Sequence, residues 1–354
     1  MKTFSLVSVK NTSNRLVAAL LSTVLITSCG APSTDSANGG AAEAASSDGG
    51  VCAPEFAEID FGIISTESQE NLEELWEPLL KDMEEKMGRP INGFYATDYA
   101  GVIEAMGAGK IQIAWYGGKS YIEAAKRSGA IAFAQTVDTD GDKGYVAHLI
   151  TNKANPIVAA IDLEAGDGDQ YIIENAGDLS FAFNDPNSTS GFLVPSYYIF
   201  AQNAITPEEA FEDLVFSGSH EATAQAVVNN QVDVATNNSE ALKRLKATDA
   251  EAFEQVQIIW TSPEIPNDPM AYQEDIPECL KEKFKDFFHN YDNKAVLDPL
   301  DWSGFDPTED AKWDPIRELD VAKRMEEVKN NEGLSEEDKA TQLEELEKEL
   351  EALK

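Results

Sequence analysis

The chain has 354 residues, with 64 acidic and 27 basic side chains and a formal net charge of -37. This length suits about two domains, and a hydrophobic share of 42% is typical of a folded protein. The acidic excess excludes nucleic acid as a default partner and disfavours anionic lipid headgroups, because both bind basic surfaces.

The first residues are typical of an export leader, which we predict over residues 1–28. A basic start precedes the apolar run Val17–Thr27, which is too short to span a bilayer. The run leads into Leu-Ile-Thr-Ser-Cys, which resembles a bacterial lipoprotein box with Cys29 as the lipidated residue. The alternative is an ordinary secretory signal with an incidental cysteine. Residues 29–51, mostly Ala, Ser, Gly, Asp and Glu, predict a flexible tether, so we expect a lipid-anchored protein in the periplasm or on the outer face of the cell membrane.

Two further cysteines, Cys52 and Cys279, lie in the remaining chain. In an oxidising compartment they could form a disulfide that joins the start of the globular body to a late helix. Two free thiols are the alternative, and the sequence does not separate the two.

Strand-like runs alternate with helical patterns along the body. Strands are predicted over Ile59–Ile64, Ile111–Trp115, Ile131–Val137, Tyr145–Thr151, Leu179–Phe183, Leu214–Phe216, Val232–Ala235 and Val256–Trp260. Helices are predicted over Asn71–Met87, Tyr99–Ala108, Tyr121–Ser128, Phe192–Asn203, Ala222–Asn230, Glu240–Ala247 and Pro277–Tyr291. This alternation predicts an α/β fold with mostly parallel sheets, in which ligands bind beyond the carboxyl ends of the strands.

The last segment, Leu334–Lys354, is almost purely Glu, Lys, Leu and Gln. An apolar stripe follows one side of this predicted helix, formed by Leu343, Leu346, Leu350 and Leu353. The stripe could pack on the body of the same chain, or it could pair with a second copy as a short coiled coil.

The loop Ser188–Gly191 follows a predicted strand and begins a predicted helix. Backbone N–H groups and the positive end of the helix dipole favour anions there, and the three hydroxyls can donate to phosphoryl oxygens. An ordinary helix cap is the alternative, but a cap needs only one hydroxyl. Gly191 would let a ligand approach the backbone. Pro195 counts against a regular helix because it lacks an N–H group.

The run from Asn184 to Pro195 (NDPNSTSGFLVP) resembles the signature of substrate-binding proteins of phosphonate ABC transporters. Further segments match that family in the same order, over Asp98–Glu104, Ile113–Gly117, Gln231–Asn238 and Pro263–Pro269. The resemblance covers about Phe61 to the C-terminus. It implies a type II periplasmic binding protein, with two α/β lobes that close on a ligand in the cleft between them. The implied lobes are residues 52–150 plus 262–330 and residues 151–261, followed by a charged helix over 331–354.

The resemblance also implies the roles of individual side chains. It implies that a phosphonate group accepts hydrogen bonds from Tyr99, Tyr145, Ser188, Thr189, Ser190 and His220. It implies that Glu240 and Asp268 hold an ammonium group at the other end of the ligand. Carboxylates would repel a phosphonate, so their presence favours a ligand that also carries a cation, and 2-aminoethylphosphonate fits.

One motif suggests a metal site, which the family resemblance does not imply. Asp138–Gly144 (DTDGDKG) looks like the start of a calcium loop, but its sixth position is Lys143 and its twelfth is Leu149, where an EF-hand has glycine and glutamate. A hydrated hairpin turn is the better interpretation, and we expect neither a metal nor a cofactor.

The sequence thus predicts a solute-binding protein that hands a phosphonate to an ABC transporter permease and catalyses no reaction. The same fold could instead be specific for phosphite or methylphosphonate. A periplasmic phosphonate or phosphate ester hydrolase and a sensory protein are alternatives of other classes.

Overall fold

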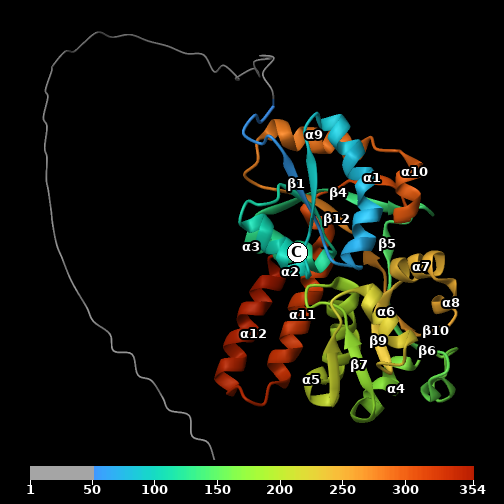
Figure 1. Ribbon diagram of the computed structural model, residues 1–354. Coiled ribbons are helices and arrows are strands. Elements are labelled where there is room, and N and C mark those ends of the chain that lie inside the picture. The colour runs from blue at the N-terminus through green and yellow to red at the C-terminus, as the bar shows by residue number, and fades with distance from the viewer. Residues whose placement is uncertain (1–51) are drawn as a thin grey trace, which may run out of the picture. The chain divides into compact units, whose positions relative to one another are not determined.

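The computed structural model describes residues 52–354, which form one compact unit built around two principal sheets (Figure 1). The predicted leader, the tether and Cys29 lie outside the described residues. Within residues 52–354, no helix is both long enough and apolar enough to cross a membrane.

The first sheet has 6 strands in the order β13-β4-β12-β3-β1-β2. Its strands are β1 (Ile59–Ile63), β2 (Ile91–Tyr95), β3 (Ile113–Trp115), β4 (Ala130–Asp138), β12 (Pro269–Gln273) and β13 (Trp302–Pro307). The helices that belong to this part of the chain are α1 (Gln69–Met87), α2 (Tyr99–Gly107), α3 (Gly118–Ser128), α9 (Glu278–His289) and α10 (Lys294–Leu297). Trp76, Trp115 and Trp302 meet in its core with ring centroids 5.2–5.9 Å apart.

The second sheet has 5 strands in the order β10-β6-β9-β7-β8. Its strands are β6 (Ala147–Asn152), β7 (Ser180–Phe183), β8 (Asp213–Phe216), β9 (Val234–Asn238) and β10 (Val256–Thr261). Its helices are α4 (Gly168–Asn175), α5 (Pro207–Ala210), α6 (His220–Val228), α7 (Ser239–Thr248) and α8 (Ala250–Phe253). Strand side chains alternate between the two faces, so Phe181 and Phe183 enter one core cluster while Ala182 enters another on the opposite face.

Both sheets are mixed, so the prediction of mostly parallel sheets was wrong. The pairs of β1 with β2 and β3, and of β7 with β8 and β9, are parallel. The pairs made by β12, β13, β6 and β10 are antiparallel. The reason is topological, because β6 and β12 each follow a crossing between the sheets and enter the new sheet against its neighbouring strands. β6 begins at Ala147, so the first crossing is complete slightly before the predicted lobe boundary at residue 150.

The two crossing segments pair with each other. β5 (Gly144–Tyr145) and β11 (Ile265–Pro266) form a small antiparallel ladder, with Tyr145 opposite Ile265. Short backbone segments that link two separately packed sheets are where a hinge would bend.

The predicted helix over Phe192–Asn203 is present but irregular, within a helical run that contains the π-helical turns η3 (Thr189–Leu193) and η4 (Ser196–Phe200) and the 3-10 turn η5 (Ala201–Asn203). The backbone hydrogen bond in η3 spans five residues, one more than in an α-helix, because the Leu193 N–H donates to the Ser188 carbonyl at 3.1 Å. Pro195 separates η3 from η4 and cannot donate a backbone hydrogen bond, which explains why a regular helix does not form. The remaining short turns are η1 (Pro156–Ala159), η2 (Ala176–Asp178), η6 (Asp298–Leu300) and η7 (Asp310–Trp313).

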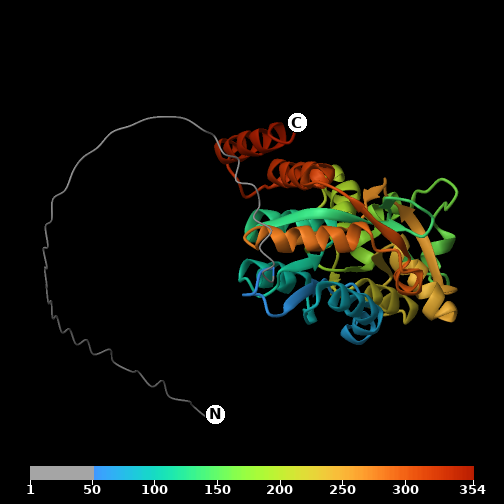
Figure 2. The same ribbon diagram turned by 90° about the horizontal axis from the view of Figure 1, so that it is seen from above.

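The C-terminal segment forms two antiparallel helices, α11 (Asp314–Asn330) and α12 (Glu336–Glu351), which lie side by side in Figure 2. Leu346 of the predicted apolar stripe is buried, and Arg324 of α11 donates to the Glu349 carboxylate of α12 at 2.8 Å. Leu346 therefore packs within the chain, while Leu343, Leu350 and Leu353 are half-buried.

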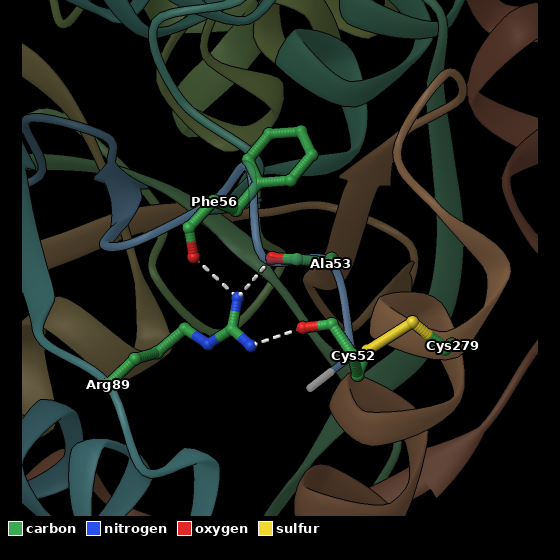
Figure 3. Close-up of a disulfide and its surroundings, with 5 residues drawn as sticks. All are labelled: Cys52, Ala53, Phe56, Arg89 and Cys279. Carbon is green, nitrogen blue, oxygen red and sulfur yellow. Dashed lines mark hydrogen bonds between the residues drawn. A yellow bond between two sulfur atoms is a disulfide. The ribbon is translucent and has the colours of Figure 1, made fainter. Parts of the chain in front are cut away.

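A disulfide joins Cys52 to Cys279 on α9, with their Cα atoms 5.9 Å apart (Figure 3). Beside it, Arg89 donates to the carbonyl groups of Cys52 at 2.6 Å, Phe56 at 2.5 Å and Ala53 at 3.1 Å. The disulfide and Arg89 together hold the start of the described chain against the elements around the first sheet.

Replacing both Cys52 and Cys279 with Ser should destabilise the protein by about 2–5 kcal/mol, because the disulfide closes a loop across a separation of 227 residues. The melting temperature measured by circular dichroism should fall by about 4–15 °C. Adding reductant to the unchanged protein should give the same fall and should leave the double variant unaffected. Equal melting temperatures for the two proteins would contradict the role of this bond.

Candidate ligand-binding site

A small cavity of about 20 Å³ lies where residues from both sheets and from β5 meet. It is lined by every side chain that the sequence assigned to a ligand, namely Tyr99, Tyr145, Ser188, Thr189, Ser190, His220, Glu240 and Asp268. All of them are buried. Lining residues that sequence reasoning did not single out are Ile64, Thr66, Trp115, Gly117, Asn238 and Arg244.

The cavity lies at the positive ends of helices that follow strands. Tyr99 begins α2, His220 begins α6, Gly117 precedes α3 and Asn238 precedes α7. The N–H groups of the first helical turn have no partner within their own helix, and the helix dipole adds positive potential. The helix dipoles therefore converge on one point, in a protein whose net charge is strongly negative. In this closed arrangement the N–H groups of Tyr99, Lys119 and His220 donate to Asp185, Thr189 and the Thr66 carbonyl.

The three hydroxyl groups after β7 are oriented by different partners. Ser188 Oγ accepts a hydrogen bond from the Gly191 N–H at 3.0 Å, which is a helix-cap contact. Thr189 Oγ1 accepts from the Lys119 N–H of α3 at 2.8 Å. Ser190 Oγ accepts from Asn238 Nδ2 at 3.1 Å. A hydroxyl oxygen that accepts a bond still has its own proton to donate, so all three can donate to an anion in the cavity.

Gly191 has a different role from the one expected. A Cβ atom at this position would lie 2.4 Å from Asn184 Cβ and 2.7 Å from Ser188 Oγ. Those distances are too short for any side chain, so glycine is required for the loop to fold back onto Asn184. The glycine shapes the hydroxyl loop itself, where the sequence suggested that it makes room for a ligand.

His220 is an uncharged donor or acceptor at the cavity wall. Its backbone N–H donates to the Thr66 carbonyl at 2.9 Å, and its Nε2 lies 3.4 Å from Ser190 Oγ and 3.3 Å from Asn238 Nδ2. Burial, together with the positive charge of Arg244, lowers the pKa of His220 to about 3. Its Nδ1 is buried and has no hydrogen-bond partner within residues 52–354.

Two tyrosines contribute phenol groups. Burial, with the nearby Asp185 and Asp268 carboxylates, raises the pKa of Tyr99 above its usual range. Burial likewise raises the pKa of Tyr145, and the Asp268 and Glu240 carboxylates add to this effect. Both phenols therefore keep their protons at neutral pH and are hydrogen-bond donors.

Glu240 and Asp268 place two carboxyl groups in the same enclosed space. Burial raises the pKa of Glu240 to about 7, although the Arg244 guanidinium acts in the opposite direction. Burial also raises the pKa of Asp268 well above its usual range, and the Glu240 carboxylate raises it further. Asp268 Oδ1 is buried without a hydrogen-bond partner in the described part of the chain. A cation placed between these groups would stabilise both in their charged forms.

Arg244 is a charged lining residue of the cavity that sequence reasoning missed. It lies on α7, one turn after Glu240, and its Nε atom donates to the carboxylate of Glu67 in the segment between β1 and α1. The only sequence signal is its spacing of four residues from Glu240, which places both on one side of a helix. Its partner lies 177 positions away in the sequence, so the pair could not be predicted.

Comparisons with known proteins identify the family of this chain. The family model described as "ABC transporter, phosphonate, periplasmic substrate-binding protein" matches residues 61–313. The phosphonates-binding periplasmic protein of Escherichia coli K12 is 46% identical over 299 residues, which cover 83% of this chain and 85% of that protein.

Solved structures show the same fold. A binding protein component of an ABC phosphonate transporter from Pseudomonas aeruginosa matches with a TM-score of 0.79 and 44% identity, covering 84% of this chain and 96% of that one. A Prochlorococcus marinus protein solved in complex with methylphosphonate matches with a TM-score of 0.66 and 21% identity, covering 74% and 97%. The chain therefore belongs to the family of periplasmic substrate-binding proteins of phosphonate ABC transporters.

Proposed function

We propose that this protein captures 2-aminoethylphosphonate in the cavity and delivers it to the permease of its transporter. The observation that carries the proposal is the pair of buried carboxyl groups, Glu240 and Asp268, in the same cavity as a cluster of uncharged donors. A ligand with an anion at one end and a cation at the other satisfies both groups at once.

The phosphonate end would be bound by the donors. Ser188, Thr189 and Ser190 donate from their hydroxyls, Tyr99 and Tyr145 from their phenols, and His220 from a ring N–H. Hydrogen bonds to a charged acceptor are the strong kind, and helix N-termini support them without adding a full positive charge.

The ammonium end would lie between Glu240 and Asp268. An ion pair at about 4 Å has a Coulomb energy of about 4 kcal/mol at an effective dielectric of about 20, from which the cost of desolvating both charges is subtracted. Without the cation, two buried carboxylates repel each other and at least one must hold a proton. The ligand ammonium therefore contributes both affinity and selectivity.

Binding would require the two sheets to move apart. A cavity of about 20 Å³ has room for about one water molecule, and a phosphonate is larger. Contacts between the part of the chain around the first sheet and the part around the second sheet close the site. Two of them are the hydrogen bond from the Lys119 N–H to Thr189 and the one from the His220 N–H to the Thr66 carbonyl. We propose that residues 52–150 plus 262–330 and residues 151–261 act as two lobes that open about β5 and β11.

Methylphosphonate or phosphite is the second candidate, since either is smaller than 2-aminoethylphosphonate and would need less opening of the cavity. The solved protein from Prochlorococcus marinus carries methylphosphonate, although at 21% identity it shares only the fold. Neither ligand has a cation, so neither would use Glu240 and Asp268. This makes the amino ligand the better proposal.

Hydrolysis is poorly supported by the geometry. Ser190 lies 3.4 Å from His220 Nε2, which invites comparison with a nucleophile and its base. A histidine with a pKa of about 3 is a weak proton acceptor at neutral pH, and among the described residues its Nδ1 has no carboxylate partner to orient the ring. We therefore propose a binding protein that catalyses no reaction, as its relatives' descriptions suggest.

Calorimetry with Glu240→Gln tests the assignment of the ammonium end. The wild-type protein should bind 2-aminoethylphosphonate more tightly than methylphosphonate. Glu240→Gln keeps the shape of the side chain but removes its charge, so the amino ligand should lose about 2–5 kcal/mol, or roughly 30- to 4,000-fold in affinity. Methylphosphonate should change little.

The matched control is Glu251→Gln, because Glu251 is exposed on α8 and does not line the cavity. Equal losses for both ligands in Glu240→Gln would contradict the ammonium role. Tighter binding of methylphosphonate by the wild-type protein would favour the second candidate.

Binding of the amino ligand should strengthen as the pH rises from 5 to 8. The ammonium binds the ionised form of Glu240, whose pKa is raised to about 7, so below pH 7 binding must release a proton. Other charged groups that act on Glu240 are Arg244, Asp138, Asp301, Lys243 and Asp268. The ratio of the dissociation constants for 2-aminoethylphosphonate and methylphosphonate should fall by up to about tenfold per pH unit. A ratio that does not vary with pH would contradict this.

We also propose that Cys29 carries a lipid anchor. Expression of the full chain should place the protein in the membrane fraction, and Cys29→Ser should release it to the soluble fraction with its phosphonate affinity intact. The measurement is fractionation followed by immunoblotting. Membrane retention of the variant at the wild-type level would argue against the anchor.

A further inference from the structure

A second hollow lies directly beside the ligand cavity. It is a groove of about 540 Å³ lined by residues of α1, α10, α6 and α7. Figure 1 shows where these helices lie, with α1 and α10 above α6 and α7. Within residues 52–354, the groove and the cavity share two lining residues, His220 and Arg244. These two side chains therefore form the partition between the hollows.

The two halves of the partition are held in different ways. His220 contacts the hydroxyl and amide groups of the proposed phosphonate end, Ser190 and Asn238. Arg244 lies one helical turn after Glu240, and its Nε atom is bound to the carboxylate of Glu67, which lines only the groove. The side chains of Arg244 and Glu67 are 16% and 13% exposed. Arg244 thus lies between the cavity and the groove, on the same helix as Glu240.

We infer that Arg244 is a specificity-determining residue that limits the length of the aminoalkyl chain a bound phosphonate can carry. The inference rests on the proposed binding of 2-aminoethylphosphonate. A ligand ammonium held by Glu240 faces Arg244, because positions four apart lie on the same side of a helix. One more methylene group would push the ammonium towards the guanidinium, which blocks it by volume and repels it by like charge.

The groove beyond the partition could accept a longer chain. Its walls combine apolar side chains such as Leu75, Val296 and Pro299 with the carboxylates of Glu67, Glu74 and Glu221. An alkyl chain would contact the former, and its terminal ammonium would be attracted by the latter. The length limit is therefore set by one side chain, and the surroundings beyond it would not exclude the ligand.

Arg244 also connects the part of the chain around the second sheet to the part around the first. A test of its effect on ligand length has to be independent of this structural role. Its pair with Glu67 lies next to the bond from the Ser68 N–H to the Glu221 carboxylate, at 2.7 Å, which makes the same connection. Loss of Arg244 could weaken closure for every ligand. A ratio of affinities between two aminoalkylphosphonates cancels that common effect.

The test compares 2-aminoethylphosphonate with 3-aminopropylphosphonate by calorimetry, with methylphosphonate as a third ligand that reports closure alone. The wild-type protein should prefer the shorter amino ligand by about 10- to 200-fold, the usual discrimination for one methylene group. In Arg244→Ala this preference should fall at least about tenfold. Arg244→Lys, which retains a long cationic side chain, should restore the preference to within about threefold of wild type.

Lys246→Ala is the matched control, since Lys246 is an exposed cation on the same helix, α7, and lines neither the cavity nor the groove. Its preference should equal that of wild type. Where Arg244→Ala does not fold, Glu67→Gln serves instead, because it frees the guanidinium from its anchor, and the preference should then fall at least about threefold.

An unchanged length preference in the folded Arg244→Ala variant, or in Glu67→Gln, would overturn the inference while leaving the proposed function intact. A wild-type protein that binds neither amino ligand more tightly than methylphosphonate would contradict the proposed function, and the inference with it. The two failures are therefore distinguishable from the wild-type data alone.

Discussion

The central constraint on this protein is that a chain with a net charge of -37 has to hold an anion. Long-range attraction cannot help, because the overall field repels an anionic ligand. The fold answers with local chemistry, since α2, α3, α6 and α7 begin around one cavity and a hydroxyl loop follows β7. Uncharged N–H and O–H donors are effective there because the site is enclosed and little water competes with the ligand.

Because the cavity is enclosed, the carboxyl groups that line it bear on the identity of the ligand. An exposed carboxylate in so acidic a chain would carry no functional meaning. Glu240 and Asp268 are instead buried beside the donors, and Asp268 Oδ1 lacks a protein partner within the described residues. Arg244 supplies one positive charge, but its Nε atom is already bound to Glu67. We therefore propose that the ligand brings its own cation, which is the physical basis for proposing an aminophosphonate.

Much of the site could be predicted because its residues occur in short segments that follow strands. The hydroxyl loop after β7 and His220 after β8 lie where an α/β sheet presents its ligands. The sheet architecture was harder to predict. The run that forms β12 contains a proline and an alanine, and β2 contains Asn-Gly, so neither has the apolar pattern of a central strand. Arg244 could not be recognised, since a helical arginine gains its role only from a distant glutamate. Pro195 did give a usable signal, as it predicted the irregular backbone after the loop.

A crystal structure of the protein with bound 2-aminoethylphosphonate tests the central claim most directly. The account predicts phosphonate oxygens within about 3 Å of the Ser188, Thr189 and Ser190 hydroxyls, and the ligand nitrogen within about 3 Å of both Glu240 and Asp268. A ligand nitrogen that points to solvent, or a phosphonate bound away from the hydroxyl loop, would contradict it.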